Sequence, residues 1–405
     1  MIYAATSRCD GGRHERICGA ISNDLYTWEK LGEVNGISSD ARYYENKDDY
    51  PEHIAWRDPK PFYEDGVYYC VICGRDKCEP LLRRGAAALM TSRDLLHWEI
   101  KPPLFAPRAY MELECPQLYK MGGKYYLIAS IIEDWSMRYW VADTLEGPYR
   151  VCGDNLLLPP GTHYAGRIAR FQGRDVFACW TFAKEDGPSP FGLRETPGAP
   201  IKYIPALLEV RSEPDGRMTF ASLAAWDAYA VGDAEPLFLE EPGRILDNSL
   251  SNASKGMLCS PSGMEIAATG RVHEGFTLKF RVCVKGYRAG IAFYAGSDGS
   301  AYLLELYPGE NRARLVKHFS RVLPQENVWF DYAVLCETTI DLSLGAVDVL
   351  LRSVYGEIEI SLAGRVRLAT VSTTATQGMV GLFADCASIE MSEDEIVRMR
   401  APENL

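Results

Sequence analysis

The sequence predicts an all-β protein in which a β-propeller is followed by a jelly-roll β-sandwich. Short apolar runs separated by Gly-containing turns, typical of β-strands, fill the chain. In the first half these runs repeat about every fifty residues, which is typical of propeller blades. In the second half they follow one another closely without that repeat, as in a two-sheet sandwich. We expect a propeller over 1–232, a linker over 233–262 rich in Gly, Pro and Asn, and a sandwich over 263–405.

The blade repeat is clearest in two hairpins. The first is Trp56–Cys73, WRDPKPFYEDGVYYCVIC, and the second is Leu113–Ile131, LECPQLYKMGGKYYLIASI. When Asp58 is set on Glu114, an offset of 114 − 58 = 56 residues, both continue with a proline, an apolar residue, a Gly-containing turn and a doubled tyrosine. A weaker third copy around Phe171 follows 53 residues later. We therefore expect each hairpin to form the inner strands of one blade.

The ends of the blades repeat as well. Ser22–Gly32, SNDLYTWEKLG, and Ser92–Pro102, SRDLLHWEIKP, share Ser, Asp-Leu and Trp in step, and Val141–Gly153 is a looser third version. The innermost strand of each propeller blade lines the central channel, so a residue that opens this strand points into a shared funnel. We expect Asp58 and Glu114 to face one polar pocket from adjacent blades.

Two converging carboxylates are what glycoside hydrolysis needs. One group protonates the leaving oxygen, and the other attacks or stabilises the oxocarbenium-like centre. The alternative is that Asp58 and Glu114 only bond nearby backbone at the strand starts, but their equivalent places in a repeat favour catalysis. Arg57 could hold Asp58 ionised or bond a substrate hydroxyl. Glu112 lies two residues before Glu114, on the same face of a strand, and is either a second carboxylate that raises the pKa of the acid or a surface residue.

Three further side chains are candidates for binding substrate. Trp56 is either a stacking platform for a sugar ring or part of the blade packing. His163 or Tyr164 could reach the floor of the pocket and bond a hydroxyl, although a lone histidine is more often structural. Cys70 and Cys73 have metal spacing but fall on opposite faces of a strand, so we interpret them as core residues.

Composition narrows the partners and the compartment. The net charge of −12 argues against nucleic acid or an anionic membrane as a partner and is compatible with a neutral sugar. No run of about eighteen apolar residues predicts a membrane span. The twelve cysteines are scattered, several within apolar strands, as expected for reduced thiols of a cytoplasmic protein. The six histidines form no metal-binding pattern, so we expect neither a metal nor a cofactor.

Two short motifs carry a resemblance to a known family. Arg57-Asp58-Pro59 and Glu114-Cys115-Pro116 resemble the two later signature motifs of glycoside hydrolase family 32, the β-fructofuranosidases (invertases, inulinases and levanases). The resemblance runs from about Ile17 to Met218, roughly half of the chain. It implies a five-bladed propeller followed by a sandwich, with Glu114 as general acid/base and Asp58 as the transition-state stabiliser. Cys115 would point away from the pocket and pack.

The chain departs from this family in one respect. The nucleophile of the family is an Asp in an upstream Trp-(Met/Leu)-Asn-Asp-Pro-Asn motif, and these 405 residues contain no such motif. Ile2–Ser7 reads as the second strand of a blade, so we expect the preceding strand and the first blade to lie before Met1. Asp10, in a Gly-rich turn, and Asp24, in the outer-strand repeat, are the early candidates for a substitute. An open propeller edge would need cover, which predicts a partner chain or homo-oligomer.

These observations leave three hypotheses. The first is a retaining hydrolase of β-fructofuranosyl linkages in sucrose or fructan. The second is a non-catalytic carbohydrate-binding propeller that lacks the nucleophile, and the third is an inverting family 43-type arabinosidase or xylosidase. In the sandwich, Tyr302, Tyr307 and Trp329 could be sugar platforms, but aromatic residues in sheets more often belong to the core.

Overall fold

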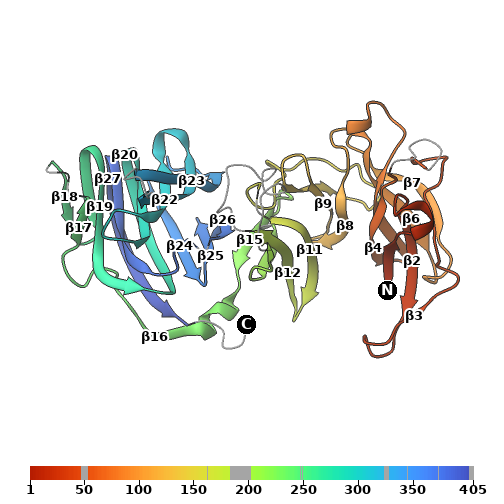
Figure 1. Ribbon diagram of the computed structural model, residues 1–405, viewed down its shortest axis with the longest axis horizontal. Coiled ribbons are helices and arrows are strands. Elements are labelled where there is room, and N and C mark those ends of the chain that lie inside the picture. Colours follow the sequence, from red (N-terminus) through yellow and green to blue (C-terminus); the bar gives the residue numbers. More distant parts are fainter. Residues whose placement is uncertain are drawn as a thin grey trace. The chain divides into compact units, whose positions relative to one another are not determined.

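The computed structural model describes residues 1–46, 53–161, 163–182, 202–246, 248, 250–322, 328–343, 345–372 and 374–400. The chain is built almost wholly of antiparallel strands, as predicted. It divides into two compact units. The first comprises Met1–Cys179 with Arg211–Met218, and the second Trp180–Val210 with Thr219–Leu405 (Figure 1).

Three antiparallel sheets make up most of the first unit, and their orders are β1-β2-β3, β4-β5-β6-β7 and β8-β9-β10. Each joins strands that follow one another along the chain, which is the arrangement of propeller blades. A further sheet has the order β11-β12-β14-β15, with β13 paired to β12. The strands of these four sheets are β1 (Ile2–Ala5), β2 (Arg16–Ile21), β3 (Glu29–Lys30), β4 (Trp56–Glu64), β5 (Val67–Arg75), β6 (Gly85–Ser92), β7 (Glu99–Phe105), β8 (Glu114–Met121), β9 (Lys124–Ile131), β10 (Ser136–Ala142), β11 (His163–Phe171), β12 (Arg174–Phe182), β13 (Lys202–Tyr203), β14 (Leu208–Ser212) and β15 (Met218–Ser222).

The hairpin repeat is confirmed, but its register differs by one residue from the prediction. In β4 the pairing with β5 is regular up to Arg57 and resumes after a bulge, and in β8 the same interruption follows Glu114. The residue after each is left-handed, with φ 59° at Asp58 and φ 48° at Cys115. Arg57 therefore corresponds to Glu114 and Asp58 to Cys115, an offset of 114 − 57 = 57 rather than 56. Asp58 and Glu114 are not equivalent positions of the repeat.

The third copy shows the same feature at the start of β11. Ala165 has φ 52°, so the residue before it, Tyr164, takes the place that Glu114 has in β8. The offset is 164 − 114 = 50 residues, not the predicted 53. A bulge adds one residue to one strand and re-aims the side chains beside it. Three successive inner strands thus have a left-handed residue near their start. The residue before it is a different amino acid in each strand.

The outer-strand repeat forms a capped turn. The Oγ of Ser22 accepts from the backbone N–H of the residue three positions on at 2.8 Å, and that of Ser92 does the same at 2.9 Å. Asp24 and Asp94 each accept two backbone N–H groups of their own turn. Backbone N–H groups of Thr27 and then Tyr26 lower the pKa of Asp24 to about 2. Asp24 therefore serves the turn, as its place in the repeat predicted.

Apolar packing holds the sheets of the first unit together. Trp56 is fully buried and its ring lies 5.0 Å from that of Tyr44. Cys70 and Cys73 are both fully buried, as predicted for core residues. Between β8 and β11, the Gln117 side chain donates to the carbonyl of Ile168 at 2.6 Å and accepts from its N–H at 2.8 Å.

The second unit contains a twelve-stranded sheet with the main order β17-β19-β27-β20-β21-β22-β23. Off this path, β16 pairs with β27, β18 with β19, β24 with β20, and β25 lies between β24 and β26. Its strands are β16 (Ala230–Glu235), β17 (Gly243–Leu246), β18 (Asn252–Ser254), β19 (Met257–His273), β20 (Phe276–Ala295), β21 (Ala301–Tyr307), β22 (Arg312–Val322), β23 (Val328–Thr339), β24 (Ala346–Val354), β25 (Glu357–Leu362), β26 (Arg365–Val371) and β27 (Gly378–Met399). The short 3-10 helices of the chain are η1 (Arg8–Asp10), η2 (Leu81–Arg83), η4 (Ala224–Tyr229) and η5 (Pro308–Glu310).

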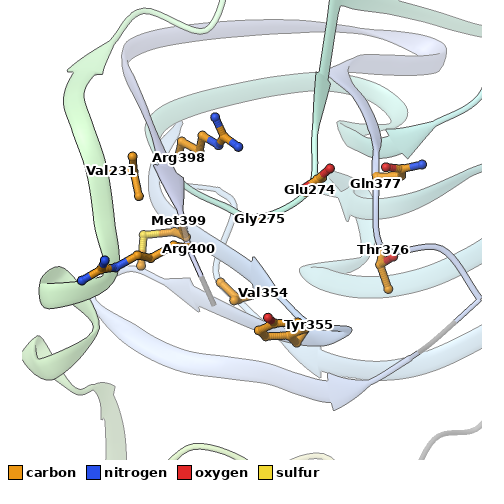
Figure 2. Close-up of a pocket in the computed structure, with 10 residues that line it drawn as sticks. All are labelled: Val231, Glu274, Gly275, Val354, Tyr355, Thr376, Gln377, Arg398, Met399 and Arg400. Carbon is orange, nitrogen blue, oxygen red and sulfur yellow. The ribbon is translucent and has the colours of Figure 1, made fainter. Parts of the chain in front are cut away.

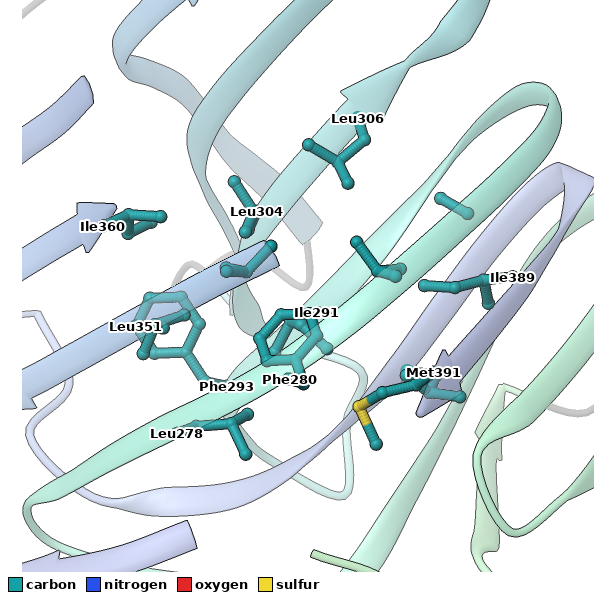
Figure 3. Close-up of a cluster of buried hydrophobic side chains, with 14 of the residues drawn as sticks. Leu278, Phe280, Ile291, Phe293, Leu304, Leu306, Leu351, Ile360, Ile389 and Met391 are labelled. Atoms are coloured by element: carbon teal, nitrogen blue, oxygen red, sulfur yellow. The ribbon is translucent and has the colours of Figure 1, made fainter. Parts of the chain in front are cut away.

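The core of this unit is a large apolar cluster that includes Phe280, Phe293 and Leu351 (Figure 3). The predicted linker over 233–262 contains β17 and β18, which pair with β19, so this stretch belongs to the sheet. Its Gly and Pro residues concealed the strands. Tyr302 and Tyr307 are both buried, so neither is a platform, and the Trp329 side chain lies outside the described residues.

An ionic cluster crosses the sheet next to this core. Arg288 donates to Glu305 at 2.5 Å and to Asp385 at 3.0 Å. The Tyr307 hydroxyl donates to the other oxygen of Glu305 at 2.8 Å. Strands β27, β20 and β21 run side by side here in regular register, with Arg288 directly opposite Asp385. We refer to these four residues as the Arg288 cluster.

Candidate active site

Arg57 is the centre of the candidate site. Its Nη2 donates to Glu112 and to Glu114, each at 2.5 Å, and its Nη1 donates to Glu15 at 3.3 Å. Its Nε lies 3.7 Å from a carboxylate oxygen of Asp58. One guanidinium that is 17% exposed thus gathers four carboxylates from segments far apart in the sequence. We refer to these five residues as the Arg57 cluster.

Asp58 and Glu114 are brought together from neighbouring sheets, as predicted. The backbone N–H of Cys115 donates to Asp58 at 2.9 Å, which joins the left-handed residue of β8 to that of β4. That the Cys115 side chain points away from the pocket stays a prediction, because the bond to Asp58 comes from the backbone of this residue. Burial first, and then the Asp58 charge, raise the pKa of the Cys115 thiol to about 12. Cys115 is therefore a neutral thiol at the site.

Tyr164 completes the surroundings of Glu114. Its hydroxyl donates to the carboxylate oxygen that Arg57 leaves free. Burial and the adjacent Glu114 charge raise the pKa of Tyr164, so the hydroxyl keeps its proton and stays a donor. The ring packs against Trp135 with centroids 5.0 Å apart. Arg57 in β4 and Tyr164 in β11 each precede a left-handed residue, and each bonds a different oxygen of Glu114 in β8.

Glu112 connects the site to a buried chain of charges. It precedes β8 rather than lying on it, and its second oxygen is 3.6 Å from Arg75. Arg75 in turn pairs with Glu45 at 2.7 Å, and Glu45 with Arg84 at 2.5 Å. Arg75 and Glu45 are 1% and 2% exposed. Alternating signs allow charges to be buried here because each has an opposite neighbour.

One of the predicted substrate-binding residues does not reach the site surface. Trp56 is fully buried against Tyr44, so its role as a stacking platform is wrong and the packing alternative holds. His163 and Tyr164 are equally buried, each 5% exposed. In the predicted pair of His163 and Tyr164, the tyrosine is the residue whose hydroxyl reaches the catalytic candidate Glu114.

Glu15 is a site residue that the sequence analysis missed. It accepts from the backbone N–H of Trp56 at 3.2 Å as well as from Arg57. It lies in the charged run RHER, where nothing in the spacing sets it apart from a solvated surface. Of the two predicted substitutes for a nucleophile, Asp10 bonds Arg16 and the Gly12 N–H close to its own turn, and Asp24 caps a turn.

The described ranges lack the features of a metal site and of a membrane-spanning helix. These residues contain no group of three or more His, Cys, Asp or Glu side chains arranged to hold a metal ion. The helices within them are short, and none could cross a bilayer. The Arg57 cluster offers carboxylates and a guanidinium, and Tyr164 adds a hydroxyl beside it, a set suited to proton transfer and to stabilising positive charge at a sugar ring.

Comparison with known proteins identifies the first half of the chain. Residues 1–188 match the profile of the Glycosyl hydrolases family 32 N-terminal domain. These residues belong to glycosyl hydrolase family 32. Within them lie both family motifs and every member of the Arg57 cluster.

The family 32 relatives include one curated protein and several solved structures. Sucrose-6-phosphate hydrolase from Klebsiella pneumoniae is 31% identical over 126 residues, which are 29% of this chain and 24% of that protein. The chain thus matches about a quarter of the length of that relative. Fructan 1-exohydrolase IIa from Cichorium intybus has a TM-score of 0.68 at 13% identity, over 100% of this chain and 81% of that one. The β-fructofuranosidase BmSUC1 from Bombyx mori has a TM-score of 0.61 at 15% identity, over 99% and 77%.

These family 32 structures support a common fold. At such low identity the likeness shows architecture alone, and the architecture is the predicted one, a propeller-type region followed by a C-terminal β-sandwich. The number of blades stays a prediction.

Proposed function

We propose that the protein hydrolyses β-fructofuranosyl linkages of sucrose or a fructan. The observation that carries this proposal is the pairing of Glu114 and Asp58, from neighbouring sheets, around Arg57 in a family 32 domain. The names of the similar proteins support the same substrate class, because they are fructan, fructoside and sucrose phosphate hydrolases.

In the proposed retaining reaction Glu114 is the general acid/base. It gives its proton to the leaving oxygen as the bond from that oxygen to the anomeric carbon breaks. Arg57 and Tyr164 hold its two oxygens in place. Asp58 accepts hydrogen bonds from fructosyl hydroxyls and stabilises the positive charge that develops on the ring. A carboxylate from outside these residues attacks the anomeric carbon as the leaving oxygen departs and forms the glycosyl–enzyme bond. Water then attacks the same carbon, gives a proton to Glu114 and releases the carboxylate.

The attacking carboxylate is the part of the reaction that these residues do not supply. The 405 residues contain no Trp-(Met/Leu)-Asn-Asp-Pro-Asn motif, so the proposal assigns the nucleophile to a segment outside them or to a partner chain. This same observation favours the second candidate function, a propeller that binds fructosides without cleaving them, because losing the nucleophile removes most of the activity. A cytoplasmic location is proposed with either function, and the twelve cysteines, all of them described and none in a disulfide, support a reducing compartment.

The test measures release of sugar by the whole protein. Sucrose, inulin, levan and an aryl-arabinoside are incubated with the protein and with Glu114→Gln. The hydrolase proposal expects free fructose from at least one fructoside, no arabinose, and loss of release in the variant. Binding of a fructoside that Asp58→Asn removes, with no release of sugar, would support the binding propeller instead, and arabinose release would contradict both.

A further inference from the structure

A hollow opens at one end of the sandwich unit. It has a volume of about 590 Å³ and is lined by the end of β27, by β16 and by the turns that join β19 to β20 and β24 to β25 (Figure 2). This volume lies within the range of sites for small molecules. All of its lining residues belong to the second unit, so it is separate from the Arg57 cluster.

A second hollow of about 610 Å³ adjoins the first. The two share Val231, Glu274 and Arg398 as lining residues, so they lie next to each other. We refer to the two hollows together as the end groove and to each hollow as one half of it. Arg398 lines both halves, so a ligand in either one can contact it.

Arg398 is firmly positioned by the backbone. Its residue pairs with Val231 of β16 on one side and with Phe276 of β20 on the other. Among the described residues, no hydrogen bond or ion pair engages the Arg398 guanidinium or the Glu274 carboxylate. The end groove therefore offers five N–H donors and two acceptor oxygens that are free to meet a ligand.

An aromatic ring lies at the rim of the first half. Tyr355 is 64% exposed and has φ 54°, a left-handed conformation that a bulky residue seldom adopts. Figure 2 shows Tyr355 on the opposite side of the hollow from Arg398, with Gln377 and Glu274 on the wall above it. An exposed ring beside planar polar groups suits a sugar, whose apolar face stacks while its hydroxyls accept and donate hydrogen bonds.

The second half of the groove is polar and nearly balanced in charge. Arg271 and Glu235 form an ion pair at 2.5 Å, and Asp233 and His273 complete the wall. Burial, and then the charge of Arg271, lower the pKa of His273, so it is neutral near pH 7. Arginines and carboxylates line the groove together, which favours a neutral polar ligand over a strongly charged one.

We propose that the end groove binds a short neutral oligosaccharide, with sugar units on either side of Arg398 and one of them stacked on Tyr355. The choice of fructosyl units rests on the proposed function of the first unit.

The test is a calorimetric titration of the full chain with a fructo-oligosaccharide, made in the Glu114→Gln background to prevent cleavage. We expect two binding events per chain. Arg398→Ala and Tyr355→Ala should each weaken one event about tenfold or abolish it, since each removes a contact of about 1.4 kcal/mol. Matched controls are Arg281→Ala and Tyr332→Ala, exposed residues of the same unit outside the groove. Thermal unfolding of each variant checks that it is folded. Arg398→Lys keeps the positive charge but loses the paired N–H donors of the guanidinium, so it should lose part of the affinity.

The outcomes separate this inference from the proposed function. A single binding event that Asp58→Asn removes and Arg398→Ala leaves unchanged would overturn the proposal that the end groove binds sugar. It would support a fructoside site in the propeller unit. A single event that the groove variants remove would support the groove while counting against the propeller as a fructoside site. Equal losses in the two control variants, or no binding at all, would overturn the inference.

Discussion

The Arg57 cluster and the Arg288 cluster are chemically alike and structurally different. Each has an arginine bonded to two carboxylates at 2.5–3.0 Å and a tyrosine hydroxyl that donates to one of them. In the sandwich the strand pairing keeps its register at the cluster, although Cys386 beside Asp385 is left-handed with φ 48°, and Glu305 is 0% exposed. In the propeller unit the residues stand beside bulges with left-handed backbone, and Glu114 is 18% exposed.

The difference teaches that this set of side chains does not by itself make an active site. In both clusters the described partners use both oxygens of the central glutamate, and in the sandwich the fully buried Glu305 and its partners brace neighbouring strands. At the bulged strand starts, four carboxylates compete for Arg57, and Asp58 and Glu114 keep part of their surface exposed. We therefore expect substitutions in the first cluster to affect catalysis and those in the second to affect stability.

The largest effect is expected at Glu114. Glu114→Gln removes the proton donor and should lower kcat for fructose release about a thousandfold, within the range of general acid–base catalysis. The free energy of unfolding, measured by urea denaturation, should change by less than about 1.5 kcal/mol because the shape is kept. A loss of stability with activity retained would contradict the assignment of the Arg57 cluster to catalysis.

Arg288→Met should give the opposite result. It leaves two carboxylates, one of them fully buried, without their cation and should lower the free energy of unfolding by about 3 kcal/mol. Fructose release by the fraction that remains folded should be unchanged. Arg281→Met, which alters an exposed pair at 3.8 Å, is the matched control with an expected effect below about 1 kcal/mol.

Asp58→Asn should lower kcat about a hundredfold, less than the change at Glu114. Asparagine tolerates the left-handed backbone at this position, so the loss would report the missing charge rather than strain. Circular dichroism and the urea midpoint should match those of the unmodified protein. Activity close to that of the unmodified protein would contradict the role of Asp58 as a charge stabiliser.

The smallest effect is a pH dependence in the sandwich. Burial raises the pKa of Glu305 above its ordinary value, although the Arg288 charge opposes this. The folded state therefore holds this proton more tightly than the unfolded state, and stability falls as the pH rises from the ordinary carboxyl range through the folded pKa. Urea denaturation at several pH values should show a shallower fall for Glu305→Gln. An unchanged slope would mean that another group titrates.

The sequence predicted the hairpins and the fold class because both depend on local patterns. The doubled tyrosines and Gly-containing turns place β4, β5, β8 and β9 correctly, and the doubled tyrosines themselves are 125 − 68 = 57 residues apart. Aligning Asp58 with Glu114 gave an offset of 56 residues instead. This alignment was wrong by one residue because the position of a bulge cannot be read from the spacing of residues. The left-handed φ angles of Asp58 and Cys115 show where the extra residue lies.

The site was predicted only in part, for a related reason. Asp58, Glu114, Arg57 and Tyr164 were found from the motifs and the repeat, whereas Glu15 reaches Arg57 across 42 residues that contain no matching pattern. Trp56 was misjudged because burial depends on packing between sheets, here against Tyr44, which residue type alone does not reveal.

The left-handed residues at the start of β4, β8 and β11 have a consequence for mutational scanning. Glycine and asparagine should be accepted at Cys115 and Ala165, while valine and isoleucine should be rejected there whether or not the protein has any enzymatic role. Loss of folded protein on these substitutions would reflect the left-handed backbone at these positions rather than a catalytic role. In an alignment of family 32 sequences, the left-handed backbone alone should restrict the residue types found at these positions. A restricted set there is therefore not by itself evidence of a catalytic role.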